Sequence, residues 1–115
     1  MIKKGIVLYN IELDNCLNGV WTNEINDGKI RNEIAKKLKE ADNIIEGAYT
    51  SVFIDIDNEL YTCRLEISLN GTRGTYTFKW DNIQHKCNST SAKYEGIGYM
   101  VNEKQIAVHY WQTNL

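Results

Sequence analysis

The chain has 115 residues, enough for one hydrophobic core but too few for two, so we expect residues 1–115 to form a single domain. Hydrophobic residues make up 43% of the sequence and charged residues 24%, a composition typical of folded rather than disordered chains. The formal net charge of −2 gives no general attraction for polyanions, so we do not expect a nucleic acid as the partner.

Targeting signals and cysteine usage both favour the cytoplasm. The N-terminus turns polar too early for a secretory signal, and no apolar run approaches the roughly 20 residues that span a bilayer. Cys16, Cys63 and Cys87 are odd in number and too widely spaced for a CxxC motif, which suits a reducing compartment. We therefore expect a cytoplasmic protein that does not enter a membrane.

The N-terminal third contains two predicted strands and one predicted helix. Residues 6–13 alternate between two faces, which indicates a strand, and residues 17–23 predict a short second strand. Between residues 29 and 41 the apolar residues instead recur at helical spacing, at Ile30, Ile34, Ala35, Leu38 and Ala41. This pattern predicts one amphipathic helix, capped by Asn26 or Asp27 and supported by an i,i+4 pair of Glu33 with Lys37.

The remainder of the chain is predicted to be a meander of strands at 44–56, 60–69, 74–81, 93–101 and 105–112. The clearest alternation places one set of residues on a single face, packed against Ile34 and Leu38 or against a barrel core: Tyr61, Cys63, Leu65, Ile67 and Leu69. Asn70-Gly71 and Asp57-Asn58 predict hairpin turns, as does 102–104. The polar stretch 82–92 predicts the one long loop.

A sheet with so many antiparallel strands has two exposed edges unless it closes or is covered. We therefore predict a mainly β (α+β) fold, an antiparallel, closed or strongly curled sheet or small barrel with one amphipathic helix at about 29–41.

Catalytic and metal-binding chemistry find little support in the residue pattern. His85 falls in the polar loop and His109 on a strand, and neither has a cysteine or carboxylate at ligand spacing. We expect no metal, no cofactor and no catalytic residues. A small enzyme that uses Cys63 or His109 remains an alternative, since the fold can bring such residues together.

The aromatic residues are the most informative set, because tyrosine and tryptophan combine an apolar body with a polar tip and suit the walls of a ligand pocket. On predicted strands they are Trp21, Tyr49, Tyr61, Tyr76, Trp80, Tyr94, Tyr99, Tyr110 and Trp111. We expect most of these side chains to be core and a few to face a cavity.

Short motifs add a resemblance. Residues 17–23 (LNGVWTN) contain Gly-x-Trp with a following Asn, residues 47–52 (GAYTSV) contain Gly-x-Tyr, and residues 74–80 (GTYTFKW) form an aromatic strand ending in Trp. Residues 94–96 (YEG) and 108–111 (VHYW) follow at similar spacing. In these segments the chain resembles the avidin family of eight-stranded ligand-binding barrels, which are close in architecture to lipocalins and other calycins.

The resemblance implies a ligand site in the barrel. It carries the family's ligand contacts over to five residues of this chain: Asn23, Tyr49, Ser51, Trp80 and Trp111. The chain departs from the family in its predicted helix, in an additional strand before the first motif and in lacking the last strand with its ligand-binding carboxylate. We therefore expect a ligand other than biotin, and we expect the strand at 6–13 to take the vacant place in the barrel.

These observations favour a non-catalytic cytoplasmic protein that holds a small polar or aromatic ligand, with Trp80 and Tyr49 lining the same cavity. Such a protein can act as a sponge that lowers the free concentration of a metabolite or nucleotide signal, for instance in a phage that blunts host defence. The alternatives are a protein–protein interaction or inhibitor module and the small enzyme named above. A homo-oligomer is compatible with each of them.

Overall fold

A computed structural model describes residues 3–12, 16–25, 29–38, 45–71, 74–86 and 88–114. In these residues the backbone forms nine β-strands and no helix. The strands are β1 (Lys4–Ile11), β2 (Cys16–Asn23), β3 (Arg31–Lys37), β4 (Gly47–Ile54), β5 (Leu60–Asn70), β6 (Thr75–His85), β7 (Asn88–Ser89), β8 (Tyr94–Asn102) and β9 (Gln105–Gln112). The described part of the chain thus contains no helix long and apolar enough to cross a membrane.

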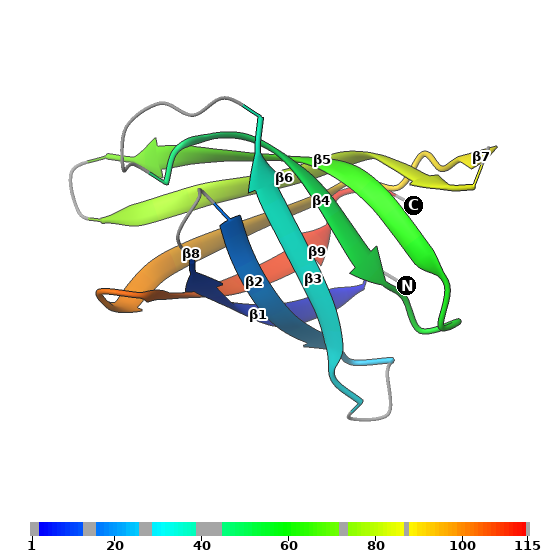
Figure 1. Ribbon diagram of the computed structural model, residues 1–115, viewed down its shortest axis with the longest axis horizontal. Coiled ribbons are helices and arrows are strands. Elements are labelled where there is room, and N and C mark those ends of the chain that lie inside the picture. The colour runs from blue at the N-terminus through cyan, green and yellow to red at the C-terminus, as the bar shows by residue number, and fades with distance from the viewer. Residues whose placement is uncertain are drawn as a thin grey trace.

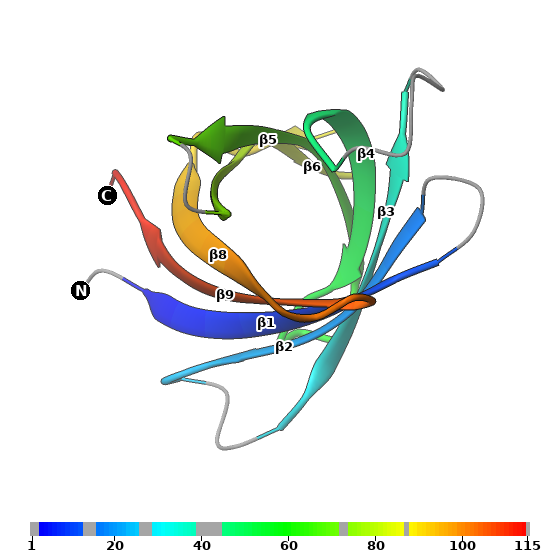
Figure 2. The same cartoon turned by 90° about the vertical axis from the view of Figure 1, so that its left-hand side faces the viewer.

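Eight of the strands form one closed antiparallel barrel. Neighbouring strands follow the order β5-β4-β3-β2-β1-β9-β8-β6, and β5 pairs with β6 to complete the ring. Figure 1 shows the strands from the side, and Figure 2 shows them curving around a common interior. The two-residue strand β7 pairs only with the end of β6. The prediction of a closed antiparallel sheet is therefore confirmed.

The additional N-terminal strand takes the place predicted for it. β1 lies between β2 and β9, where Val7 pairs with Trp21 on one side and with Val108 on the other (Figure 2). Because both edges of β1 are paired, the barrel has no open seam there and no unpaired backbone groups that invite aggregation.

Side-chain alternation divides each strand into an inner and an outer face. On β5, Cys63, Leu65 and Ile67 are buried, as the sequence predicts. Tyr61 is half-buried at one end of this row, whereas Leu69 is 50% exposed at the other and lies outside the core. The period of two therefore identified the inner face correctly and failed only where the strand runs beyond the barrel wall.

The predicted helix at 29–41 is wrong over residues 31–37, which form β3. Its cap residues Asn26 and Asp27 and residues 39–41 lie outside the described residues. Within β3, Glu33, Ala35 and Lys37 point inward and are buried, while Ile34 is 54% exposed. Of the described residues in the helical stripe, Ile30, Ile34 and Leu38 are exposed, whereas Ala35 is buried. β3 is a strand because β2 and β4 pair with it on both sides, and these backbone hydrogen bonds override a local helical pattern.

The turns follow the predicted residues, but the long loop is shorter than predicted. Gly71 and Gly74 adopt positive φ angles of 72° and 73° between β5 and β6, and Asn58 adopts 63° between β4 and β5. Such angles are accessible to glycine and asparagine at low cost. Within the predicted loop 82–92, residues 82–85 continue β6 and residues 88–89 form β7, so the polar sequence there belongs to an exposed sheet end.

Candidate functional site

A cavity of about 310 Å³ lies at one end of the barrel. Its walls come from the first halves of β1, β3, β5 and β8 and from the second halves of β2, β4, β6 and β9. Four residues outside these strands complete the lining: Lys3, Asp55, Thr90 and Ala92. Tyr9, Leu65 and Phe78 are fully buried in the hydrophobic core. The barrel therefore combines a packed core with a ligand-sized cavity at one end.

Two rows of aromatic rings face the cavity. In the first row, Trp21 contacts Phe53 edge-on with ring centroids 6.2 Å apart, and Phe53 stacks on Tyr61 at 5.5 Å. In the second row, Tyr110 contacts Trp80 at 5.8 Å and Tyr94 at 6.0 Å, in both cases edge-on. All six of these residues line the cavity. Ring contacts within each row fix the side chains, so the walls are preformed rather than assembled by a ligand.

A buried carboxylate forms the floor of the cavity. Glu33 is 6% exposed and lines the cavity from β3. Its Oε2 atom accepts hydrogen bonds from the Tyr9 hydroxyl at 2.7 Å, the Ser51 hydroxyl at 2.6 Å and Nε1 of Trp80 at 3.2 Å. Three strands far apart in the sequence therefore hold one carboxylate oxygen in place.

Opposing effects act on the pKa of this carboxyl. Burial raises the pKa of Glu33, because the charged form loses its hydration, while the hydrogen bonds from Ser51, Tyr9 and Trp80 favour the charged form and lower it. Burial prevails, so the pKa lies above its ordinary value. The pKa of the Tyr9 hydroxyl is raised well above its usual range by burial and by the neighbouring Glu33 charge, so Tyr9 stays a donor.

One wall residue has a hydrogen-bond donor with no acceptor. Trp21 is only 7% exposed, and its buried Nε1 has no hydrogen-bond partner among the described residues. An indole N–H can only donate, and a buried donor without a partner is costly. Trp21 lines the cavity, so a bound molecule can supply the missing acceptor.

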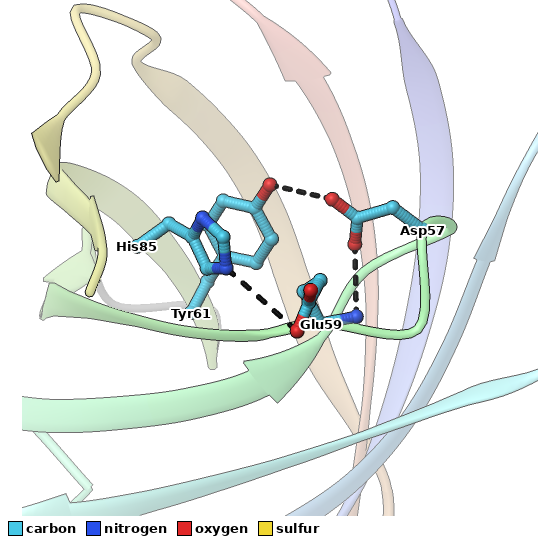
Figure 3. Close-up of polar contacts among 4 residues, drawn as sticks. All are labelled: Asp57, Glu59, Tyr61 and His85. Atoms are coloured by element: carbon cyan, nitrogen blue, oxygen red, sulfur yellow. Dashed lines mark hydrogen bonds and ion pairs between the residues drawn. The ribbon is translucent and has the colours of Figure 1, made fainter.

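A polar cluster adjoins the cavity at Tyr61. Figure 3 shows the hydroxyl of Tyr61 donating to Asp57 at 2.8 Å, while the backbone N–H of Glu59 donates to the other oxygen of Asp57 at 2.9 Å. The His85 ring stacks on Tyr61 with centroids 4.8 Å apart, and its Nε2 lies 3.8 Å from a Glu59 oxygen, too far for a hydrogen bond. The hydrogen bond to Asp57 raises the pKa of Tyr61 to about 12.

The five site residues named from the sequence fall into different places. Asn23 and Trp80 line the cavity. Ser51 is completely buried behind the floor and reaches the cavity only through its hydrogen bond to Glu33. Tyr49 and Trp111 are not among the lining residues.

Strand geometry explains why Tyr49 and Trp111 miss the cavity. Tyr49 lies four residues before Phe53 on β4, a distance of about 13 Å along a strand, and its hydroxyl donates to the Ile45 carbonyl at 2.7 Å. Trp111 alternates with the inward-facing Tyr110 and packs beside His109 on the outer face. The expectation that Trp80 and Tyr49 line one cavity is therefore wrong.

The residues of the alternative enzyme hypothesis lie on opposite sides of the barrel wall. Cys63 is buried on the inner face, and burial raises the pKa of its thiol, which disfavours the nucleophilic thiolate. His109 is exposed on the outer face of β9. Among the residues that the structure describes, no three histidine, cysteine, aspartate or glutamate side chains are grouped as metal ligands would be.

Sequence reasoning missed Glu33, the residue around which the floor is built. Its charge and its place in a helix-like pattern pointed to a solvated surface. The signal that could have revealed it is the alternation Glu33, Ala35, Lys37 when read with period two. Phe53 was missed for a simpler reason, because its segment was considered only for its tyrosine and serine.

The fold and the site define a class of protein, a closed eight-stranded antiparallel β-barrel, consistent with a calycin-like architecture, whose interior ends in an aromatic-walled cavity with a buried carboxylate. Compared with protein-family models, with curated proteins and with solved structures, the chain matches none of them.

Proposed function

We propose that this protein is a non-catalytic binding protein that holds a small, flat aromatic or heteroaromatic molecule with a polar edge in the barrel cavity. The observation that carries this proposal is the pairing of two aromatic rows with a buried polar floor around about 310 Å³ of space. Apolar walls with a few fixed polar groups are the usual composition of small-molecule sites. Tyr61 links this wall to a polar cluster with Asp57 and His85.

Binding without turnover fits a sponge for a metabolite or nucleotide signal. Cys63 and His109 lie on opposite faces of the barrel wall, so they are not placed to act together on a molecule in the cavity. We propose the cytoplasmic location and the setting in a phage that blunts host defence from the sequence alone. The resemblance to avidin at Asn23 and Trp80, also read from the sequence, supports ligand binding.

Native mass spectrometry of the protein purified from its host tests the proposal, because a co-purified small molecule reports its own mass and stoichiometry. We expect Ala92→Trp, which fills the cavity mouth, to abolish that species. The matched control is Ala107→Trp, the same substitution on the outer face, which should retain it. Absence of any ligand in host-purified protein, together with no stabilisation by a library of aromatic metabolites, would contradict the proposal.

The outer surface supports a second candidate function, self-association. Two rows of outward side chains run across β2, β1, β9 and β8, and they include exposed apolar groups at Ile6, Val20, Ile97 and Tyr99. A second copy of this chain is the occupant that we favour, because these four side chains are uncharged and an isologous contact must be self-complementary. Sedimentation of the wild type and of Ile97→Glu tests it, since only the wild type should dimerise.

A further inference from the structure

The polar groups at the cavity floor restrict the chemistry of the ligand. All three hydrogen bonds to Glu33 converge on Oε2, and no described residue donates to Oε1. The two oxygens of a carboxylate together offer about four acceptor positions, so three donors leave room for another. Since Glu33 lines the cavity, its Oε1 atom offers an acceptor to a molecule that enters.

A complementary donor lies beside this acceptor. β2 pairs with β3 so that Gly19 is opposite Glu33 and Trp21 is opposite Arg31. Trp21 is therefore the diagonal neighbour of Glu33 on the inner face, at a backbone separation of roughly 7–8 Å in an antiparallel sheet. The unpartnered Nε1 and the Oε1 atom thus belong to neighbouring residues that both line the cavity.

This inference rests on the proposed function. We propose that the cavity selects planar nitrogen heterocycles that present an N–H donor to Oε1 of Glu33 and a carbonyl oxygen or ring nitrogen to Nε1 of Trp21. The amide edge of a lactam, which several nucleobases share, carries both groups side by side. The rings of Phe53, Tyr61 and Trp80, on the neighbouring strands β4, β5 and β6, line the cavity and supply faces for such a ring system.

Other ligand classes satisfy the floor less well. A purely apolar ring leaves both the carboxylate oxygen and the indole N–H buried without partners, which costs affinity because their water is displaced without replacement. An anion such as a free phosphate places negative charge in a cavity whose described lining carries two carboxyl groups, Glu33 and Asp55, against one amine, Lys3. An aliphatic amine satisfies Glu33 but not Trp21, and it makes no use of the aromatic rows.

Three small probes separate these requirements: 2-quinolone, with donor and acceptor; N-methyl-2-quinolone, with the acceptor only; and indole, with the donor only. Titration calorimetry measures the affinity of each for the wild-type protein. We expect 2-quinolone to bind at least about tenfold more tightly than either of the others, because each loses one hydrogen bond in a dry site, and tenfold corresponds to about 1.4 kcal/mol.

Variants assign the donor contact to its residue. Glu33→Gln replaces one carboxylate oxygen with an amide donor, so we expect the preference for 2-quinolone over its N-methyl derivative to disappear. The matched control is Glu66→Gln on the outer face of β5, which should retain the preference. Should Glu33→Gln not fold, the wild-type comparison of the two quinolones still decides the matter.

The possible failures are distinguishable. Equal affinities for the three probes overturn this inference but leave the proposed function standing. Failure of all three probes to bind at their solubility limits also overturns it, while native mass spectrometry of host-purified protein decides the proposed function independently. Loss of the quinolone preference in Glu66→Gln as well as in Glu33→Gln overturns the assignment of the donor contact to Glu33.

Discussion

Glu33 shows how a single charged residue is accommodated inside a small barrel. Desolvation opposes its ionisation, and the donors on Oε2 reduce this cost without removing it. Tyr9, Cys63 and Tyr110 lie near it, and burial raises the pKa of each of these, so they stay neutral around pH 7. Of these four groups, Glu33 is the one whose ordinary pKa lies below pH 7, and burial raises that pKa.

The raised pKa of Glu33 predicts how its replacement changes stability. The contribution of Glu33 to the free energy of unfolding is fully present below its pKa in the unfolded chain, near the ordinary value of 4.5, and is lost as the pH rises through its pKa in the folded protein. Glu33→Gln does not titrate. Between these two pH values we therefore expect the free energy of unfolding of Glu33→Gln to rise relative to that of the wild type, by at most about 1.4 kcal/mol per pH unit. Urea denaturation from pH 4 to pH 8 measures the difference. A gain for wild type with rising pH would mean that the pKa of Glu33 is lowered.

Loss of a hydroxyl should reduce stability more at Tyr9, which donates to Glu33, than at Tyr49, which lies away from the cavity. Tyr9→Phe keeps the ring stacked on Phe78 but removes one donor from a buried carboxylate, so we expect a loss of about 1.5–3 kcal/mol at pH 8. Tyr49→Phe loses one bond to the Ile45 carbonyl, at about 0.5–1.5 kcal/mol, and should leave ligand affinity unchanged. Thermal unfolding and titration of the two variants check this. Weaker ligand binding by Tyr49→Phe would restore Tyr49 to the site.

At the scale of the element, β3 is the segment where the sequence misleads. Its outward Ile34 and the following Leu38 are apolar and more than half exposed, while its inward Glu33 and Lys37 are charged. The usual rule that charge faces water is reversed, and the remaining pattern matches a helix by chance. In the strand, Glu33 and Lys37 lie about 13 Å apart rather than one helical turn apart. Only pairing with β2 and β4 reveals the true period, and such long-range pairing is not visible in a local window.

A pair of substitutions distinguishes the strand from the helix. Ala35 is fully buried between larger side chains, so Ala35→Leu should overpack the interior and cost about 1–3 kcal/mol. Ile34→Thr, at an exposed strand position, should change stability by no more than about 0.5 kcal/mol. An amphipathic helix would make Ile34 the sensitive position. Chemical denaturation of both variants provides the measurement, and a larger loss for Ile34→Thr would contradict the strand.

Long-range strand pairing also limited how much of the site could be predicted from the sequence. Asn23 and Trp80 lie on the cavity lining, at positions of β2 and β6 where the alternation of side chains is regular. Tyr49 and Ser51 belong to the correct strand, but its register relative to the cavity depends on the tilt and stagger of the whole barrel. Trp111 was assigned to the wrong face, because β9 carries aromatic residues on both faces, Tyr110 on the inner face and Trp111 on the outer face. Most strand positions and the closure of the sheet were therefore predictable, whereas depth within the barrel was not.

At the scale of the whole molecule, the barrel wall separates the tryptophans into two groups. Trp21 and Trp80 line the cavity, and Trp111 lies outside it. We expect Trp111→Phe to retain most of the fluorescence change that 2-quinolone causes, and Trp80→Phe to lose a large part of it. Both substitutions keep an aromatic ring, so each variant should fold. A fluorescence change that depends mainly on Trp111 would place the ligand on the outer surface.

The pairing of β1 with β9 sets the order in which this protein can be made. Lys4 lies opposite Trp111, so the first strand to leave the ribosome has one neighbour, β2, at hand and must wait for the other until synthesis reaches β9. The β5–β6 hairpin closes over a short loop and can form early, whereas bringing β1 to β9 carries the largest loop-closure entropy. Val7 from β1 and Tyr110 from β9 both line the cavity. The wall of this cavity is therefore incomplete until β9 is in place.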